Sequence, residues 1–350
     1  MKTERRYDID WLRVIAIALL LIYHVAIVFQ PWGALIRFIQ SDESWEGLWI
    51  PMSMLNVWRI PILFIVSGMG VGFALRKRSW KELLAERSRR ILVPFVFGLL
   101  LIAPIHVLLW QEYYNQDIKY LLHPGHLWFL GNIFIYVLLI IPFLMLKESH
   151  IAKRFSSVVG KLINTPFIFI IVPGVFAAEA FIVQPEIYTL YALTWHGFFL
   201  GLLAFLFGYY VIRYGINFWQ MVVRWRWVNL IIAGVFFIFR YLYFHLNAPN
   251  FLLAMESNAW IFTVFGFAYK YLNHPGKALS YLSQGAYPIY IVHMIFLYLG
   301  AVIIIPLKLP VQLEFVLVLI FTFAGCFLSY EFFIKRVKFL RPLFGLKNIQ

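Results

Sequence analysis

The feature of this sequence that most constrains its fold is a series of apolar runs, each about 20 residues long. A helix rises about 1.5 Å per residue, so a run of this length covers the roughly 30 Å hydrocarbon core of a bilayer. Strands of a membrane barrel would instead alternate polar and apolar residues, which runs such as IAIALLLIYHVAIVF do not do. We read ten candidate spans, at residues 11–30, 54–75, 91–111, 127–146, 166–184, 189–212, 228–246, 251–272, 286–306 and 311–334.

The composition agrees with a chain whose surface faces lipid. Hydrophobic residues make up 63% of it and charged residues 13%, whereas soluble domains have about 45–50% and about 25%. The first run is read as a retained helix, because no small-residue cleavage site of a signal peptide follows it. We therefore predict an all-α, polytopic membrane bundle of about ten helices, forming a single domain over residues 1–350 with no appended soluble domain.

The basic residues predict the orientation of the chain. Of the 30 lysine and arginine residues, 24 lie in the six segments 1–10, 76–90, 147–165, 213–227, 270–282 and 335–350. The segments between the other ends of the spans carry only Arg37, Lys119 and Lys308. Lysine and arginine collect in cytoplasmic loops, so both termini are expected in the cytoplasm. The net charge of +14 is then explained by topology, and no nucleic-acid partner is expected.

Polar residues inside the spans gather at one depth. Such residues are costly in lipid and usually face the interior of a bundle. In the predicted orientation the outer half of the membrane holds Asn56, Arg59, His24, His126, Glu179, His196, His245 and Glu256. This pattern is typical of an embedded active site or substrate cavity. A proton-coupled transporter or flippase would use the same groups, and an isolated histidine often only bonds a neighbouring helix.

Five local motifs add a family resemblance. They are IDWLRVIAIALLLIYH with Arg13 and His24, NVWRIPILFIVSG from residue 56, AERSRRILVP with Arg87 and Arg90, GHLWFL from residue 125, and AYPIYIVH ending at His293. In this order they resemble the acyltransferase 3 family of integral membrane acyltransferases, which typically has ten core helices. The second motif is also similar to the branch that includes the glucan-modifying "protein C" succinyltransferases.

The resemblance implies a function. It implies transfer of an acyl group from cytoplasmic acyl-CoA to a hydroxyl of an envelope glycan or lipid-linked acceptor at the outer face of the cell (inner, cytoplasmic) membrane. Acetyl and succinyl are the leading candidates for the acyl group. The resemblance also makes His24 the expected catalytic residue, and gives functional importance to Arg13, Arg87 and Arg90.

The residue types fit this chemistry at the outer end. Histidine titrates near neutral pH, so His24 could take the proton of an acceptor hydroxyl or carry the acyl group itself. Arg59 could stabilise a developing oxyanion or orient an acidic acyl group, and His126 and Glu179 are candidates for orienting the acceptor. His293 is assigned to packing.

The inner end offers groups for the donor. Arg87, Arg89 and Arg90 suit the phosphates of CoA, because guanidinium groups bind phosphate in a bidentate way, although positive-inside topology alone also explains them. Arg13 lies 11 residues before His24, about 16 Å along a helix, and could contact either Asp10 or a CoA phosphate. The pantetheine arm would have to thread this distance. No metal is expected, because the histidines show no ligand spacing.

Overall fold

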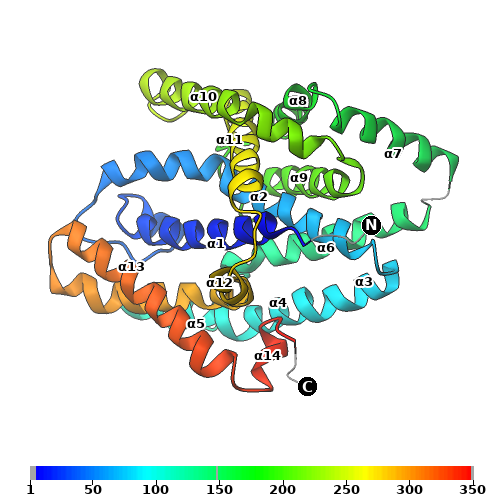
Figure 1. Ribbon diagram of the computed structural model, residues 1–350. Helices are drawn as coiled ribbons and strands as arrows, with labels where there is room; N and C mark the ends of the chain where they lie inside the picture. Colours follow the sequence, from blue (N-terminus) through cyan, green and yellow to red (C-terminus); the bar gives the residue numbers. More distant parts are fainter. Residues whose placement is uncertain (1–4, 147–148, 348–350) are drawn as a thin grey trace. The chain divides into compact units, whose positions relative to one another are not determined.

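The computed structural model describes residues 5–146 and 149–347, and within these ranges the regular structure is entirely helical. Figure 1 shows the helices of the described residues. Contacts between Cα atoms divide the chain into two compact units, each made of three separate segments. Unit 1 comprises residues 1–13, 53–86 and 132–279, and unit 2 comprises residues 14–52, 87–131 and 280–350. The two units are described separately below.

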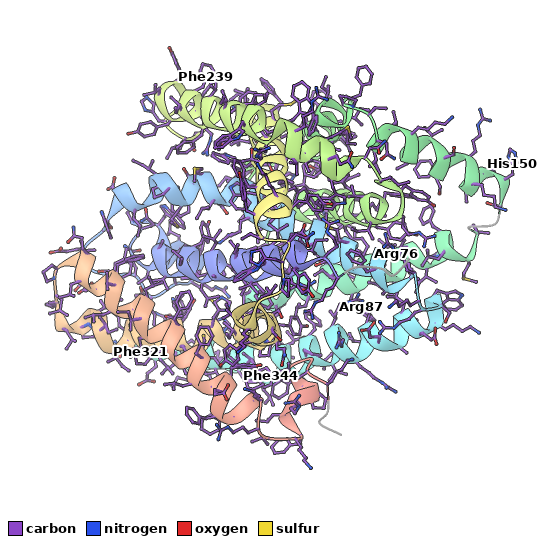
Figure 2. The ribbon with its side chains drawn as sticks, viewed as in Figure 1. Arg76, Arg87, His150, Phe239, Phe321 and Phe344 are labelled. Carbon is purple, nitrogen blue, oxygen red and sulfur yellow. The ribbon has the colours of Figure 1, made fainter. Side chains whose placement is uncertain are left out.

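Unit 1 contains most of the second and sixth helices and all of the seventh to eleventh. Its helices are α2 (Trp49–Ala74), α6 (Trp128–Met145), α7 (His150–Ile163), α8 (Ile168–Val183), α9 (Trp195–Tyr214), α10 (Phe218–Phe244) and α11 (Asn250–Tyr271). Helix α11 packs against both α10 and α8. One side of α10 exposes Ile231, Val235, Ile238 and Leu242 at helical spacing, and Figure 2 shows Phe239 projecting from the same helix. This apolar surface suits contact with lipid.

Unit 2 contains most of the first helix, a long interrupted helix and the C-terminal helices. Its elements are α1 (Tyr7–Val28), η1 (Gly33–Ile36), η2 (Glu46–Leu48), α3 (Trp80–Arg87, shared with unit 1), η3 (Ser88–Leu92), α4 (Val93–Phe97), η4 (Gly98–Ile102), α5 (Ala103–Tyr113), η5 (Gly125–Leu127), α12 (Lys277–Ile304), η6 (Ile305–Leu307), α13 (Val311–Leu328), η7 (Ser329–Ile334) and α14 (Leu340–Leu343).

Two prolines explain the interruptions of the long helix from α3 to α5. The segments η3 and η4 are π-helical turns, and each is followed by a proline, Pro94 or Pro104. Proline lacks the N–H that would bond the carbonyl four residues earlier, so the helix must rearrange locally. Pro104 cannot donate a hydrogen bond to the Leu100 carbonyl. This carbonyl instead accepts a hydrogen bond from the Tyr120 hydroxyl at 2.6 Å.

The prediction of a polytopic helical membrane protein is confirmed. Among the described residues, nine helices are long and apolar enough to cross a membrane, or ten if the bent pair α7–α8 forms one span. Helix α8 has 16 residues and covers about 24 Å. The basic segments before α8 and after α9 are expected on the same side of the membrane, so both helices must cross it. That requirement favours ten spans.

Helix α7 is a feature that the predicted loop 147–165 did not anticipate. It meets α8 at a bend of 116°. One face exposes Ile151, Phe155 and Val158, and the sequence between them carries Lys153 and Arg154. An amphipathic helix with a basic polar face lies in the membrane interface. We interpret α7 as an in-plane helix on the cytoplasmic surface, with α8 as the crossing segment.

The sixth predicted span begins later than expected, at Trp195 instead of residue 189. Residues 184–194 form a loop, and the Thr194 hydroxyl caps α9 by accepting from the Gly197 N–H at 3.0 Å. Farther along α9, small residues allow a close crossing with α2. A Cβ added to Gly208 would lie 1.9 Å from the Ile65 carbonyl oxygen, so only glycine permits this approach.

Candidate active site

Two histidines from distant parts of the sequence meet in unit 2. His24, near the end of α1, places Nδ1 2.9 Å from Nε2 of His293 on α12. Their rings are stacked, with centroids 5.1 Å apart and planes inclined by 9°. His293 is fully buried and its own Nδ1 lies 2.6 Å from the Tyr290 carbonyl oxygen. A direct bond between imidazoles of two transmembrane helices gives His24 a fixed orientation.

Two further histidines extend this pair into a cluster. His126, in η5, meets the His293 ring edge-on with centroids 4.8 Å apart. Its Nε2 lies 3.0 Å from the Ile291 carbonyl oxygen, and its own carbonyl accepts from the Tyr290 hydroxyl at 2.5 Å. His106, on α5, lies edge-on to His126 at 5.8 Å. We call His24, His106, His126 and His293 the histidine cluster.

Aromatic side chains enclose the histidine cluster. The His24 ring contacts Tyr23 and Phe38, each with its centroid 5.9 Å away. Tyr298 contacts both Phe38 and His106, and its hydroxyl donates to the Arg37 carbonyl at 2.6 Å. Within the described part of the chain, no group of three or more His, Cys, Asp and Glu side chains is placed to hold a metal ion. The cluster is suited to proton transfer between nitrogens.

The basic residues predicted to bind the donor lie on the long helix of unit 2. Arg87 ends α3, and Arg89 and Arg90 lie in the π turn η3. Arg89 is exposed and Arg87 is half-buried. The Arg90 carbonyl and the Tyr287 ring of α12 both lie beside Gly345. Tyr287 precedes His293 by six residues, about 9 Å along the helix. Helix α12 therefore connects the basic turn with the histidine cluster.

Arg13 lies at the N-terminal end of α1 and in unit 1. Its Nη1 is 3.8 Å from Oδ1 of Asp10, one turn earlier. The expected contact between Arg13 and Asp10 is confirmed by this geometry. The side chain of Arg13 is 39% exposed.

Arg59 of α2, in unit 1, belongs to a buried network of polar side chains. Its Nη2 donates to Oδ1 of Asn56 at 3.4 Å, and its side chain is 2% exposed. One turn earlier on α2, the Ser53 carbonyl accepts from Arg240 at 3.2 Å. Arg240 also forms a bidentate ion pair with Glu256, with N–O distances of 2.7 and 2.9 Å. These contacts hold the N-terminal part of α2 against α10 and α11.

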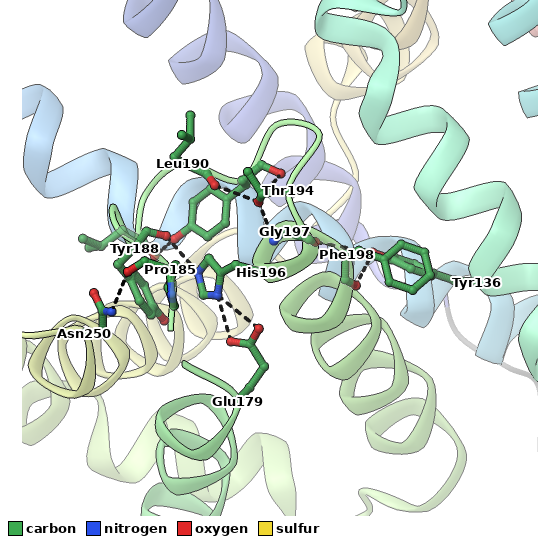
Figure 3. A network of polar contacts seen from close by, with 12 residues as sticks. Tyr136, Glu179, Pro185, Tyr188, Leu190, Thr194, His196, Gly197, Phe198 and Asn250 are labelled. Atoms are coloured by element: carbon green, nitrogen blue, oxygen red, sulfur yellow. Dashed lines mark hydrogen bonds and ion pairs between the residues drawn. The ribbon is translucent and has the colours of Figure 1, made fainter. Parts of the chain in front are cut away.

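Glu179, also in unit 1, forms a buried pair with His196 (Figure 3). Its two carboxylate oxygens lie 3.1 and 2.9 Å from His196 Nδ1. His196 Nε2 lies 2.9 Å from the Tyr188 carbonyl oxygen, which only accepts. Hydrogen bonds at both nitrogens need a proton on Nε2 and another between Nδ1 and the carboxylate. The pair thus ties α8, the loop before α9 and α9 together.

The structure brings some of the predicted residues together and places others elsewhere. His24 and His126 share the histidine cluster, and Arg87, Arg89 and Arg90 belong to the same unit. Arg13, Arg59 and Glu179 belong to unit 1. Sequence reasoning assigned His293 to packing and did not select His106, and so missed their part in the cluster. The spacing of Tyr287, Tyr290 and His293, three residues apart on one face of a helix, was the available signal.

Comparison with known proteins adds one finding. Residues 6–331 match the family model described as an acyltransferase domain, which extends over both units. Searches of curated proteins and of solved structures give no match.

Proposed function

The chain belongs to the acyltransferase 3 family of membrane acyltransferases, and from that premise we propose that it moves an acyl group from cytoplasmic acyl-CoA to an acceptor hydroxyl at the outer face. The acceptor is an envelope glycan or a lipid-linked sugar, the acyl group is acetyl or succinyl, and the membrane is the cell's inner (cytoplasmic) membrane. The observation that carries the proposal is the histidine cluster, which presents an oriented imidazole, His24, inside a membrane helix bundle.

The reaction at His24 is written as a direct transfer. The acceptor hydroxyl gives its proton to His24 while its oxygen attacks the thioester carbonyl, so a C–O bond forms. The C–S bond then breaks, and the departing thiolate takes the proton back from His24. The products are an ester and CoA, and the imidazole is regenerated. A route through an acyl-His24 intermediate yields the same products in two steps.

The donor end is assigned to basic groups of the cytoplasmic side. Arg87, Arg89 and Arg90 place three guanidinium groups within four residues of one helix, and guanidinium groups match the oxygens of phosphate. The rise of about 9 Å from Tyr287 to His293 is a distance that the pantetheine arm spans. Arg13 is a further candidate for the CoA phosphates. His126 is proposed to orient the acceptor, and roles for Arg59 and Glu179 in the reaction stay predictions.

Oriented vesicles test the sidedness of the proposal. Inverted and right-side-out vesicles that contain the protein receive radiolabelled acetyl-CoA or succinyl-CoA outside. We expect labelled ester only when the donor is on the cytoplasmic side. Equal use of the donor from either side would contradict the through-membrane reaction. Counterflow of an unmodified solute, with no labelled ester, would support the transporter instead. Mass spectrometry of envelope glycans and lipids, with and without the protein, identifies the acceptor.

A further inference from the structure

We propose that His293 is a positioning residue that fixes the tautomer of His24, so that the lone pair of His24 is on Nε2. This inference rests on the proposed function for its catalytic meaning, but the tautomer itself is a property of the protein alone. It follows from two contacts of His293, one with a backbone carbonyl and one with His24.

The backbone carbonyl determines the tautomer of His293. The Tyr290 carbonyl oxygen lies 2.6 Å from His293 Nδ1, and a carbonyl oxygen can only accept a hydrogen bond. The proton of a neutral His293 is therefore on Nδ1. Because a neutral imidazole has one N–H, Nε2 of His293 carries a lone pair. His293 is fully buried, so this arrangement is isolated from water.

The lone pair of His293 then determines the tautomer of His24. His293 Nε2 lies 2.9 Å from His24 Nδ1, a hydrogen-bond distance that requires one proton between the two nitrogens. Since His293 Nε2 has none, His24 Nδ1 must supply it. Neutral His24 consequently has its lone pair on Nε2, the nitrogen that accepts a proton or attacks a carbonyl.

The surroundings of the pair support this assignment. His126 meets the His293 ring edge-on at 4.8 Å, and the Tyr290 ring is stacked against it at 5.9 Å. The Tyr290 hydroxyl donates a hydrogen bond to the His126 carbonyl. His126 Nε2 is hydrogen-bonded to the Ile291 carbonyl. His24 is faced by the rings of Tyr23 and Phe38. In these contacts the Tyr290 hydroxyl and His126 Nε2 each bond a backbone carbonyl, while His293 Nε2 bonds His24 Nδ1.

The arrangement has a consequence for the reaction. When His24 Nε2 takes the proton of the acceptor hydroxyl, the ring becomes an imidazolium with Nδ1–H still bonded to His293. A hydrogen bond from a charged donor is stronger than one from a neutral donor. His293 therefore stabilises the protonated state of His24 more than the resting state, which is how a positioning residue assists a base.

Matched substitutions at position 293 separate this role from packing. Glutamine can place an acceptor oxygen near the position of Nε2 and so bond His24. Asparagine can bond the Tyr290 carbonyl but is too short to bond His24. Leucine can make neither hydrogen bond. We expect His293→Leu and His293→Asn to lower kcat by about 10²- to 10⁴-fold with little change in KM. His293→Gln should retain much more activity. His274→Gln, in an exposed loop between α11 and α12, is the control for a histidine change outside the cluster.

A double substitution tests whether the two histidines act as one unit. The combination of His24→Ala with His293→Leu should be no slower than His24→Ala alone, because residues that act together do not give additive losses. If asparagine, leucine and glutamine at position 293 have equal effects, or if the double variant loses the product of the single losses, the proposal is overturned. An inactive wild type would instead count against the proposed function.

A spectroscopic measurement decides the tautomer whether or not the enzyme activity is found. Solid-state NMR of protein with ¹⁵N-labelled histidine in lipid separates protonated from unprotonated ring nitrogens, and His24→Ala identifies the resonances of His24. We expect protonated Nδ1 and unprotonated Nε2 at His24, and a shift toward mixed tautomers in His293→Leu. Protonated Nε2 in the neutral wild-type ring would refute the inference.

Discussion

Replacing Gly208 by alanine tests the close crossing of α2 and α9 in unit 1. A Cβ at Gly208 would lie 1.9 Å from the Ile65 carbonyl oxygen, where ordinary contacts begin at 3.4 Å. The two backbones must therefore move apart by about 1.5 Å, and overpacking usually costs about 1–3 kcal/mol. The better helix propensity of alanine offsets only about 1 kcal/mol of this cost. Because the clash is with backbone, the cost lies at the upper end of this range, and we expect a net loss of about 2 kcal/mol.

Gly234 of α10 provides a matched control for the same substitution. No atom lies within 4 Å of a Cβ added there, so alanine should be neutral or stabilise the protein by up to about 1 kcal/mol. The assay is equilibrium unfolding in mixed detergent and SDS micelles, followed by tryptophan fluorescence. The two variants should shift the midpoint in opposite directions, or leave only Gly234→Ala unchanged. Wild-type stability of Gly208→Ala would refute the packing argument.

Three other predictions concern the donor site, a buried pair and the interfacial helix. Arg90→Gln should raise KM for acyl-CoA about tenfold, since a hydrogen bond to a charged group contributes about 1.5–3 kcal/mol, and leave KM for an acyl-pantetheine without nucleotide phosphates unchanged. Glu179→Leu should cost about 1–3 kcal/mol in the same unfolding assay, because it leaves the buried Nδ1 of His196 without its hydrogen-bond partner. A spin label at position 155 should collide more with oxygen in the lipid, and one at position 154 more with a water-soluble nickel complex, because α7 lies in the interface.

Each of these predictions has a result that would contradict it. Equal KM increases for acyl-CoA and for the acyl-pantetheine would show that Arg90 does not bind the nucleotide phosphates of CoA. A loss as small as that of Glu186→Gln, a charge change at an exposed loop residue, would show that the Glu179 pair is not structural. Spin labels with the same collision pattern at positions 154 and 155 would exclude an in-plane α7.

The membrane fold follows from the sequence wherever an apolar run has clear ends. The long helices α1 and α2 correspond to predicted spans because length and hydropathy alone define them. Helix α10 begins at Phe218, ten residues before the predicted span 228–246. The region around α8 was less predictable. Residues 185–194 are apolar enough to extend a span, but Thr194 caps α9 and Leu193 adopts a left-handed conformation with φ of 58°. Such an end depends on local hydrogen bonds, which hydropathy does not register.

Sequence reasoning selected two histidines of the cluster by residue type, but it did not predict the pairing between the members of the cluster. His24 and His126 were selected because polar groups in lipid are costly. The bond from His24 to His293 depends on how α1 and α12 are rotated about their axes, and no apolar run specifies that rotation. Glu179 was selected by the same cost, and its pair with His196 shows that a buried charge also serves to hold helices together.

The central claim is that His24 performs acyl transfer, and a single-turnover measurement tests it most directly. Purified protein in lipid vesicles is mixed with limiting radiolabelled acyl-CoA and the envelope fraction that contains the acceptor, and both labelled ester and bound donor are measured. We predict that His24→Ala binds acyl-CoA as the wild type does but forms ester about 10²- to 10⁴-fold more slowly. Ester formation at the wild-type rate by His24→Ala would contradict the account.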